Sequence, residues 1–288
     1  MVGAFKIGFM PTSFYKETSV EHICETLRSI GYDCIEWTLL HMCPRKKSEK
    51  ELKNIIRASK ENELEISEVV VQQDFVVLDD KELENNIQYV ELCIRIFASL
   101  GIKTINVFTG PIPWNKNPVK IGRDISEGNA WDKVIYAFDR IVKLAEQYNM
   151  NLAVENVWGM LCHDFYTARY LIDYYDSKWL GVNYDPSHDV LAGRFDVGWV
   201  VRKWGKKNIK HIHLKDAAGI QDNGKFIFPL LGEGYVDWSA FSNSLHDIEY
   251  EGCMSVEFES FEYLRNILDN DFESAARLSM ENIKRIIK

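Results

Sequence analysis

The amino-acid sequence predicts an α/β fold, namely a single (β/α)₈ TIM barrel with parallel strands. Three observations support this prediction. Eight short apolar runs alternate with eight helical patterns, which is typical of parallel strands joined by helical crossovers. The length of 288 residues is usual for one such barrel. No glycine-rich phosphate-binding fingerprint follows the first apolar run, which disfavours the competing open, doubly wound sheet.

The expected strands are short and rich in Val, Ile, Phe or Tyr. Several are almost wholly apolar, as expected of strands that are buried on both faces of a parallel sheet. In chain order they cover residues 5–9, 34–37, 66–71, 104–108, 152–154, 180–184, 209–214 and 254–258.

The expected helices lie between these strands and carry apolar residues at helical spacing. They cover residues 20–30, 48–63, 81–100, 131–148, 164–175, 197–203, 238–248 and 272–287. The longest irregular stretch, residues 109–129, contains three prolines, and a loop of this length is usually functional. Because no Pro/Gly/Ser-rich linker divides the chain, residues 1–288 are predicted to form a single domain.

Composition restricts the partners of the protein. The net charge of −9, from 43 acidic and 34 basic residues, argues against nucleic-acid binding, which needs a basic surface. No apolar run is long enough to span a membrane, and residues 1–10 lack the regions of a signal peptide. We therefore expect a cytoplasmic protein without membrane partners. The six cysteines are scattered, which predicts reduced thiols rather than disulfides or a cysteine zinc site.

Polar residues end four consecutive predicted strands, from the fifth to the eighth. Active-site groups of such barrels lie at the C-terminal ends of strands. The residues at these ends are Glu155, Asp185, His213 and Glu257. Three carboxylates that converge at one level repel one another, and a divalent cation removes that repulsion. The sequence therefore predicts a metal site formed by these four side chains.

The types of ligand restrict the identity of the metal. Two of the four proposed ligands, His213 and Glu257, each have a nearby alternative in the sequence. Carboxylates and an imidazole without a thiolate suit Mn²⁺, Mg²⁺ or Co²⁺, with Mn²⁺ favoured, whereas Zn²⁺ more often recruits further His or Cys. His213 is preferred to His211 because it is nearer the strand end, and His211 is either a core histidine or a support for the ligands. Glu257 is preferred to Glu259 because it follows the apolar run directly.

Four segments carry a family resemblance. They are Ala153-Val154-Glu155-Asn156, Asn183-Tyr184-Asp185-Pro186-Ser187-His188, His211-Ile212-His213-Leu214-Lys215-Asp216 and Ser255-Val256-Glu257-Phe258-Glu259. These segments resemble the xylose isomerase-like TIM barrel superfamily, which includes sugar isomerases, ketose 3-epimerases, inosose dehydratases and an apurinic endonuclease branch. The resemblance implies one metal on the four strand-end residues, with Glu155 and Glu257 also acting as acid and base. It further implies that His188 contacts a substrate hydroxyl.

The resemblance implies a metal-dependent isomerase or epimerase that acts on a sugar, polyol or sugar phosphate. Such an enzyme removes a proton alpha to a carbonyl, and a metal that chelates the carbonyl oxygen stabilises the resulting enediolate. One carboxylate takes the proton and a second returns it, so no external redox cofactor is needed. Homo-oligomers are common for such barrels, but no feature of the sequence fixes one.

Two positions depart from ketose 3-epimerases and keep other functions open. Leu161 stands where those enzymes carry a second glutamate, and Gly219 stands where they carry an arginine. Lys215 is available instead to contact a carbonyl, carboxylate or phosphate, or it is a solvated lysine. The Lys215-Asp216 pair resembles inosose dehydratase-like members, so a lyase on the same metal site is the alternative function. A non-catalytic sugar-binding barrel is a further alternative.

The remaining candidates concern the substrate and the endonuclease branch. The three-zinc cluster of that branch needs histidines where this chain has Thr109-Gly110 and Phe228-Pro229, so a nuclease is disfavoured. Trp114 either walls a sugar site or packs on the barrel rim. Glu36, which ends the second strand, is a candidate to bind a substrate hydroxyl or a neighbouring side chain. Gly232-Glu233-Gly234 is interpreted as a structural loop.

Overall fold

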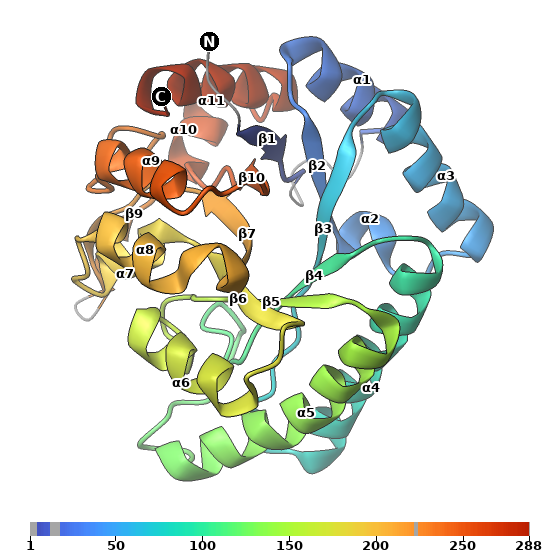
Figure 1. Ribbon diagram of the computed structural model, residues 1–288, viewed down its shortest axis with the longest axis vertical. Coiled ribbons are helices and arrows are strands. Elements are labelled where there is room, and N and C mark those ends of the chain that lie inside the picture. Colours follow the sequence, from blue (N-terminus) through green and yellow to red (C-terminus); the bar gives the residue numbers. More distant parts are fainter. Residues whose placement is uncertain (1–4, 12–17, 222–223, 288) are drawn as a thin grey trace.

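The computed structural model describes residues 5–11, 18–221 and 224–287, and within these it shows a closed barrel of eight parallel strands (Figure 1). Around the barrel the order is β1-β10-β7-β6-β5-β4-β3-β2. The strands are β1 (Lys6–Phe9), β2 (Cys34–Thr38), β3 (Glu65–Val71), β4 (Thr104–Val107), β5 (Asn151–Glu155), β6 (Leu180–Tyr184), β7 (Ile209–Leu214) and β10 (Cys253–Val256). The predicted (β/α)₈ barrel is confirmed. Part of residues 1–10, considered above for a signal peptide, lies outside the described residues.

Helices surround the barrel and connect successive strands (Figure 1). Those that match the predicted helices are α1 (Val20–Ile30), α3 (Glu49–Glu61), α4 (Asp80–Ser99), α5 (Glu127–Tyr148), α6 (Phe165–Tyr175), α8 (Val197–Asn208), α9 (Trp238–Asp247) and α11 (Phe272–Ile286). Helix α5 begins earlier than predicted because the Ser126 side chain accepts a hydrogen bond from Asn129 N and caps the first turn. Helix α8 continues past Lys203 through a non-helical residue, Gly205. None of the helices in the described residues is long and apolar enough to cross a lipid bilayer.

Short elements that the sequence pattern does not predict follow the C-terminal ends of four barrel strands. Helices α2 (Leu39–Met42), α7 (Pro186–Leu191) and α10 (Phe261–Asn266) come after β2, β6 and β10. An antiparallel hairpin of β8 (Ala218–Ile220) and β9 (Lys225–Ile227) comes after β7. Because active sites of such barrels lie at this end, these elements shape the surroundings of the predicted site.

The barrel is apolar outside and polar in part of its interior. Large side chains such as Trp37, Trp204 and Tyr32 are fully buried, and each large apolar side chain buried contributes roughly 1.5–3 kcal/mol. Asn106 and Asn183, on β4 and β6, are also completely buried. Buried polar groups need partners, so this interior layer must be built around polar contacts. The six cysteines are buried and free.

Candidate metal centre

The structure brings the four predicted ligands together at the C-terminal mouth of the barrel. Glu155 ends β5, Asp185 follows β6, His213 lies near the end of β7, and Glu257 follows β10. These strands are consecutive neighbours around the barrel. Each of the four side chains offers one ligand atom, and these atoms all lie within 4.8 Å of one another. All four side chains are buried.

His213 presents its two ring nitrogens to two different sets of carboxylates. Its Nδ1 lies 3.1 Å from Glu155 Oε1 and 3.2 Å from Glu257 Oε2. Its Nε2 lies 2.9 Å from Glu36 Oε1. Because Nδ1 faces the other predicted ligands, the tautomer with the proton on Nε2 leaves a lone pair for a metal on that side and a hydrogen bond for Glu36.

Asp185 is fixed by the turn that starts α7. Its Oδ1 accepts hydrogen bonds from Ser187 N at 2.8 Å and Ser187 Oγ at 2.6 Å, so Asp185 caps the helix. Pro186 occupies the first helical position, where its missing N–H costs nothing. The side chain of Asn156 makes two hydrogen bonds with the Asp185 backbone. It accepts one from Asp185 N at 3.0 Å and donates one to Asp185 O at 2.9 Å. The Asp-Pro-Ser-His segment therefore holds one carboxylate in a set position.

Lys215 is buried in the centre rather than solvated. Its Nζ lies 2.5 Å from Glu257 Oε2, 2.9 Å from Asp185 Oδ2 and 3.2 Å from Glu259 Oε2. Burial alone would lower the pKa of Lys215, but Asp185 and Glu257 outweigh burial and raise that pKa well above its usual value. The ammonium group therefore stays charged and offsets part of the negative charge of the carboxylates.

The two candidate acid/base residues have different environments. Burial raises the pKa of Glu155. The nearby His213 lowers that pKa, but the pKa stays above its usual value. Burial acts on Glu257 as well, but Lys215 and His213 overcome it and lower the pKa of that carboxyl. Asn106 Nδ2 donates to Glu155 Oε2 at 2.7 Å, which leaves Glu155 Oε1 directed at His213. Carboxyl groups whose environments separate their pKa values are suited to different roles in proton transfer.

A cavity of about 580 Å³ opens above these residues. Its polar lining includes Glu155, His188, Lys215, Glu257 and Glu259. Its aromatic lining consists of Phe108, Trp114, Trp158, Phe228 and Phe261. Trp114 is 54% exposed and packs edge-on against Phe108, with ring centroids 5.8 Å apart. The cavity thus combines apolar walls with a few polar groups at one place, as small-molecule sites usually do.

His188 reaches the cavity from α7 as a neutral imidazole. Burial and then Lys215 lower the pKa of His188 to about 3. Its Nδ1 accepts a hydrogen bond from Trp158 N at 3.5 Å, so the ring proton is on Nε2, which lies 3.4 Å from Asp185 Oδ2. A neutral ring in this position can donate to an oxygen in the cavity.

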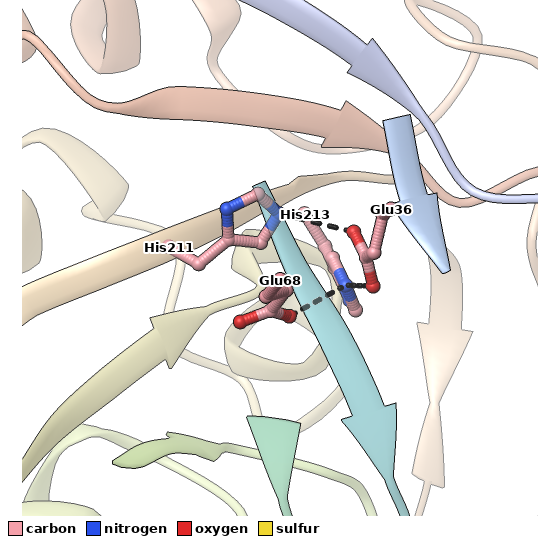
Figure 2. A group of neighbouring side chains, drawn as sticks. All are labelled: Glu36, Glu68, His211 and His213. Carbon is pink, nitrogen blue, oxygen red and sulfur yellow. Dashed lines mark hydrogen bonds and ion pairs between the residues drawn. The ribbon is translucent and has the colours of Figure 1, made fainter. Parts of the chain in front are cut away.

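Glu36 is not part of the cavity lining, and it lies beside Glu68, His211 and His213 (Figure 2). Its side chain is fully buried, with Oε1 2.9 Å from His213 Nε2 and Oε2 3.0 Å from His211 Nε2. The sequence left two kinds of partner open for Glu36, a substrate hydroxyl or a neighbouring side chain. In the structure its partners are the side chains of His211 and His213. His211 also lies 3.0 Å from Ser255 Oγ, so it supports the carboxylate rather than reaching the mouth.

The two departures from ketose 3-epimerases have different structural settings, one in the core and one in the backbone of a hairpin. Leu161 is buried in the core cluster. Gly219 lies in β8 with a φ of +112°, and a Cβ placed there would be 2.2 Å from Lys225 O in β9. An arginine therefore cannot occupy position 219 without rearranging the hairpin. The hairpin instead brings Phe226 to a ring-centroid distance of 5.0 Å from Trp158.

Two further residues matter: Asp216, which the sequence patterns indicate only as part of the Lys215-Asp216 pair, and Glu68, which they do not single out. Asp216 accepts hydrogen bonds from Gly232 N, Gly234 N and Trp238 Nε1 at 2.9, 3.0 and 2.9 Å, so it anchors the long connection after β7. This agrees with a structural role for the Gly-Glu-Gly loop. Glu68 is a fully buried carboxylate inside β3. The sequence signal that could have identified Glu68 is a single charged residue within a predicted strand that is mostly apolar.

The donor set at the mouth fits a divalent cation. Three carboxylates and one imidazole are oxygen and nitrogen ligands that Mn²⁺, Mg²⁺, Co²⁺ and Zn²⁺ accept. Two ligands at about 2.1 Å from a metal and at right angles to each other lie about 3.0 Å apart. His213 Nδ1 lies 3.1 and 3.2 Å from the nearest oxygens of Glu155 and Glu257, close to that spacing.

The fold and this cluster define an α/β barrel with a candidate metal site at its mouth. A family model described as xylose isomerase-like TIM barrel matches residues 24–286. The chain therefore belongs to the xylose isomerase-like TIM barrel family, as the resemblance predicted. An inosose dehydratase of Clostridium perfringens is 24% identical over 167 residues, which cover 54% of this chain and 56% of that protein. The chain thus spans about half the length of this curated relative.

Solved structures match over nearly the whole chain. The IolI protein, crystallised with a bound zinc atom, is 17% identical with a TM-score of 0.77, over 98% of each chain. D-psicose 3-epimerase from Clostridium cellulolyticum, crystallised with D-tagatose, is 16% identical with a TM-score of 0.76, over 99% of this chain and 100% of that one. At these identities the structures confirm the fold.

Proposed function

We propose that the protein is a divalent-metal-dependent isomerase or epimerase of a sugar or sugar derivative that removes a proton alpha to a carbonyl. The observation that carries this proposal is the placement of Glu155 and Glu257. The two carboxylates come from β5 and β10, lie 3.1 and 3.2 Å from His213 Nδ1, and both line the cavity. Two carboxylates on different strands can serve opposite sides of one substrate.

Glu155, Asp185, His213 and Glu257 would hold the metal, for which Mn²⁺ is favoured. The zinc atom bound to the IolI protein supports a divalent cation in this fold. A cation bound there would stabilise negative charge that develops on a substrate carbonyl oxygen. Glu36 would keep His213 in the required tautomer by accepting the proton on Nε2, as carboxylates beside metal-binding histidines commonly do.

The side chains around the cavity have separate tasks in this proposal. One of Glu155 and Glu257 removes the proton and the other returns it. Lys215, held at 2.5 Å from Glu257, directs positive charge towards the substrate oxygens. His188 donates to a hydroxyl, and Trp114 packs against the apolar C–H face of the sugar ring while helping to exclude water.

A lyase that dehydrates a keto polyol on the same residues is the second candidate. The similarity to inosose dehydratases and the Lys215-Asp216 pair favour it. The backbone at Gly219, which excludes the arginine of ketose 3-epimerases, also fits it better. Both candidates begin with the same proton abstraction and differ in what happens next. A sugar-binding barrel without catalysis is the remaining alternative.

One experiment separates the three candidates. Ketoses, inososes and their phosphates are incubated with the protein and Mn²⁺ in deuterated water, and the products are analysed by mass spectrometry. An isomerase or epimerase gives a product that has gained a deuteron on carbon, and a dehydratase gives a product that has lost a water. Failure to exchange or convert any compound would contradict both enzymatic proposals.

The role of Glu257, one member of the glutamate pair, is tested with one substitution and one matched control. Glu257→Gln removes the carboxylate charge without changing its size and is expected to lower turnover at least 100-fold, since general acid–base groups contribute roughly 10²–10⁴ in rate. Glu25→Gln, at an exposed position of α1, should leave turnover unchanged. Equal activity of Glu257→Gln and wild type would remove Glu257 from the mechanism.

A further inference from the structure

A second cluster of possible metal ligands lies beneath the first, inside the barrel. Glu36 on β2, Glu68 on β3, and His211 and His213 on β7 converge there (Figure 2). Their candidate ligand atoms all lie within 4.8 Å of one another. The exposed fraction of each side chain is 1% or less. Except for His213, these residues take no part in the site at the mouth as a ligand.

An irregularity in the sheet places the second carboxylate in this cluster. Between β2 and β3 the register moves from Ile35 opposite Ile66 to Trp37 opposite Val69. Glu36 therefore faces two residues, Ser67 and Glu68, instead of one. Such a bulge changes the direction of a side chain and is typical of functional positions. Here Glu68 ends up on the same interior face as Glu36.

Among the residues that the structure describes, Glu68 has no hydrogen-bond donor, although it is completely buried. Neither carboxylate oxygen accepts a hydrogen bond. The nearest imidazole nitrogen, His213 Nε2, is 3.8 Å from Oε1 and already lies 2.9 Å from Glu36. The neighbouring Asn106 directs its amide nitrogen to Glu155. A buried carboxylate that has no hydrogen-bond donor and whose imidazole contact is as long as 3.8 Å is costly, and a cation or a proton at this place would remove that cost.

The geometry and the charge of the cluster suit a cation. Glu36 Oε2 and His211 Nε2 are 3.0 Å apart, close to the spacing of about 3.0 Å expected for adjacent ligands of one metal with bonds of about 2.1 Å. Two carboxylates neutralise a divalent ion. Within the described parts of the chain, the side-chain oxygens of Asn106 on β4 and Asn183 on β6 also lack donors, so the surroundings are rich in acceptors.

We propose that Glu36, Glu68 and His211 form a second divalent-cation site, buried in the barrel below the centre at the mouth. The cation would take Glu36 Oε2, Glu68 and His211 Nε2, whereas Glu36 Oε1 keeps its contact with His213 Nε2. His213 then separates the two sites, because its Nδ1 faces the upper one. Carboxylate and imidazole ligands suit Mn²⁺ and Zn²⁺. This inference does not depend on the proposed function.

The test counts metal ions per chain. The full chain is stripped with a chelator, equilibrated with Mn²⁺ in one arm and Zn²⁺ in another, freed of excess metal, and analysed by elemental mass spectrometry. Wild type should hold two equivalents in at least one arm, and Glu68→Gln should hold one in that arm. Glu65→Gln, the matched control on the same strand whose side chain is exposed, should hold two. One equivalent in wild type in both arms, or equal counts for wild type and Glu68→Gln, overturns the proposal.

A second variant keeps the test decisive if Glu68→Gln does not fold. Asp185→Asn/Glu257→Gln disables the upper site and leaves all three proposed ligands in place. One equivalent retained by this variant supports the buried site, and none overturns it. Failure of the proposed function would appear as absent turnover with unchanged metal counts, so the two failures are distinguishable.

Discussion

At the scale of single residues, Lys215 balances the charge of the candidate centre. Its side chain is 3% exposed, and its ammonium group contacts three carboxylates. Breaking a buried ion pair by removing one partner typically costs roughly 3–5 kcal/mol, because the remaining charges lose their compensation. Lys215 therefore affects stability as well as the substrate.

The substitution Lys215→Met tests this charge balance. We expect the metal-free variant to lose roughly 3–5 kcal/mol of unfolding free energy in a urea titration, and saturating Mn²⁺ to restore part of it. The control is Lys206→Met, which breaks an exposed ion pair with Glu251 and should cost less than about 1 kcal/mol. Similar losses for the two variants would show that Lys215 is not a buried counter-charge.

Asp74, in the loop after β3, holds the loop after β4 that carries Trp114. Its Oδ1 accepts from Val76 N at 2.9 Å, and its Oδ2 accepts from Ile112 N at 2.8 Å, two residues before Trp114. Burial raises the pKa of Asp74 from 3.8 to about 6 although the backbone hydrogen bonds oppose it. The folded protein thus binds a proton at Asp74 more tightly than the unfolded chain does.

The raised pKa of Asp74 predicts how the unfolding free energy depends on pH. A raised folded pKa contributes stability that is present below about pH 4 and is lost as the pH rises through about 6. The contribution amounts to roughly 3 kcal/mol. The unfolding free energy of wild type relative to Asp74→Asn should therefore fall between about pH 4 and pH 7, measured by urea titration. A constant or rising difference over this interval would contradict the assignment.

At the scale of elements, the β8–β9 hairpin sets the departure from ketose 3-epimerases. Gly219 adopts a φ of +112°, and a Cβ there would meet Lys225 O at 2.2 Å and Phe226 Cα at 2.6 Å. Gly224, in the same hairpin region, has a φ of +64° and open space around its missing Cβ. The two glycines share a backbone requirement but differ in steric freedom.

Alanine at each glycine separates these effects. Gly224→Ala should cost about 1 kcal/mol, the usual penalty of a left-handed conformation for a residue with a Cβ. Gly219→Ala should cost more, because the steric clash adds to the conformational penalty. Thermal unfolding monitored by calorimetry measures both. Equal losses would mean that the hairpin opens readily enough to accept a side chain at position 219.

At the scale of the whole molecule, the barrel closes where β1 meets β10. Gly8 pairs with Ser255 on one side and Cys34 on the other. A Cβ at Gly8 would lie 2.8 Å from Ser255 Oγ, the hydroxyl that also contacts His211. Closure of the barrel therefore depends on the absence of a side chain at this position.

Replacement of glycine by alanine is expected to change the unfolding free energy in opposite directions at Gly8 and Gly128. Gly8→Ala should lower the unfolding free energy by roughly 1–3 kcal/mol, as overpacking does. Gly128→Ala, in helix α5 with open space around the missing Cβ, should raise it by up to about 1 kcal/mol. Urea titrations of both variants provide the comparison, and a neutral Gly8→Ala would show that the closure is loosely packed.

The sequence by itself determined the barrel and the four residues at its mouth. Strand runs and helical spacing are local patterns, and the rule that parallel-barrel sites lie at strand ends turns those patterns into a position in space. Glu155, Asp185, His213 and Glu257 are close together because each lies at or next to the C-terminal end of one of four neighbouring strands. The single-domain organisation and the cytoplasmic location stay predictions.

Only the tertiary structure decided which side chains complete the interior. Glu36 and His211 meet across the barrel although they are 175 residues apart in the sequence. Glu68 faces them because the register between β2 and β3 shifts by one residue, and Lys215 turns inward because three carboxylates surround its ammonium group. Local patterns do not encode a one-residue shift or a contact across a closed sheet, since both depend on how distant strands pack together.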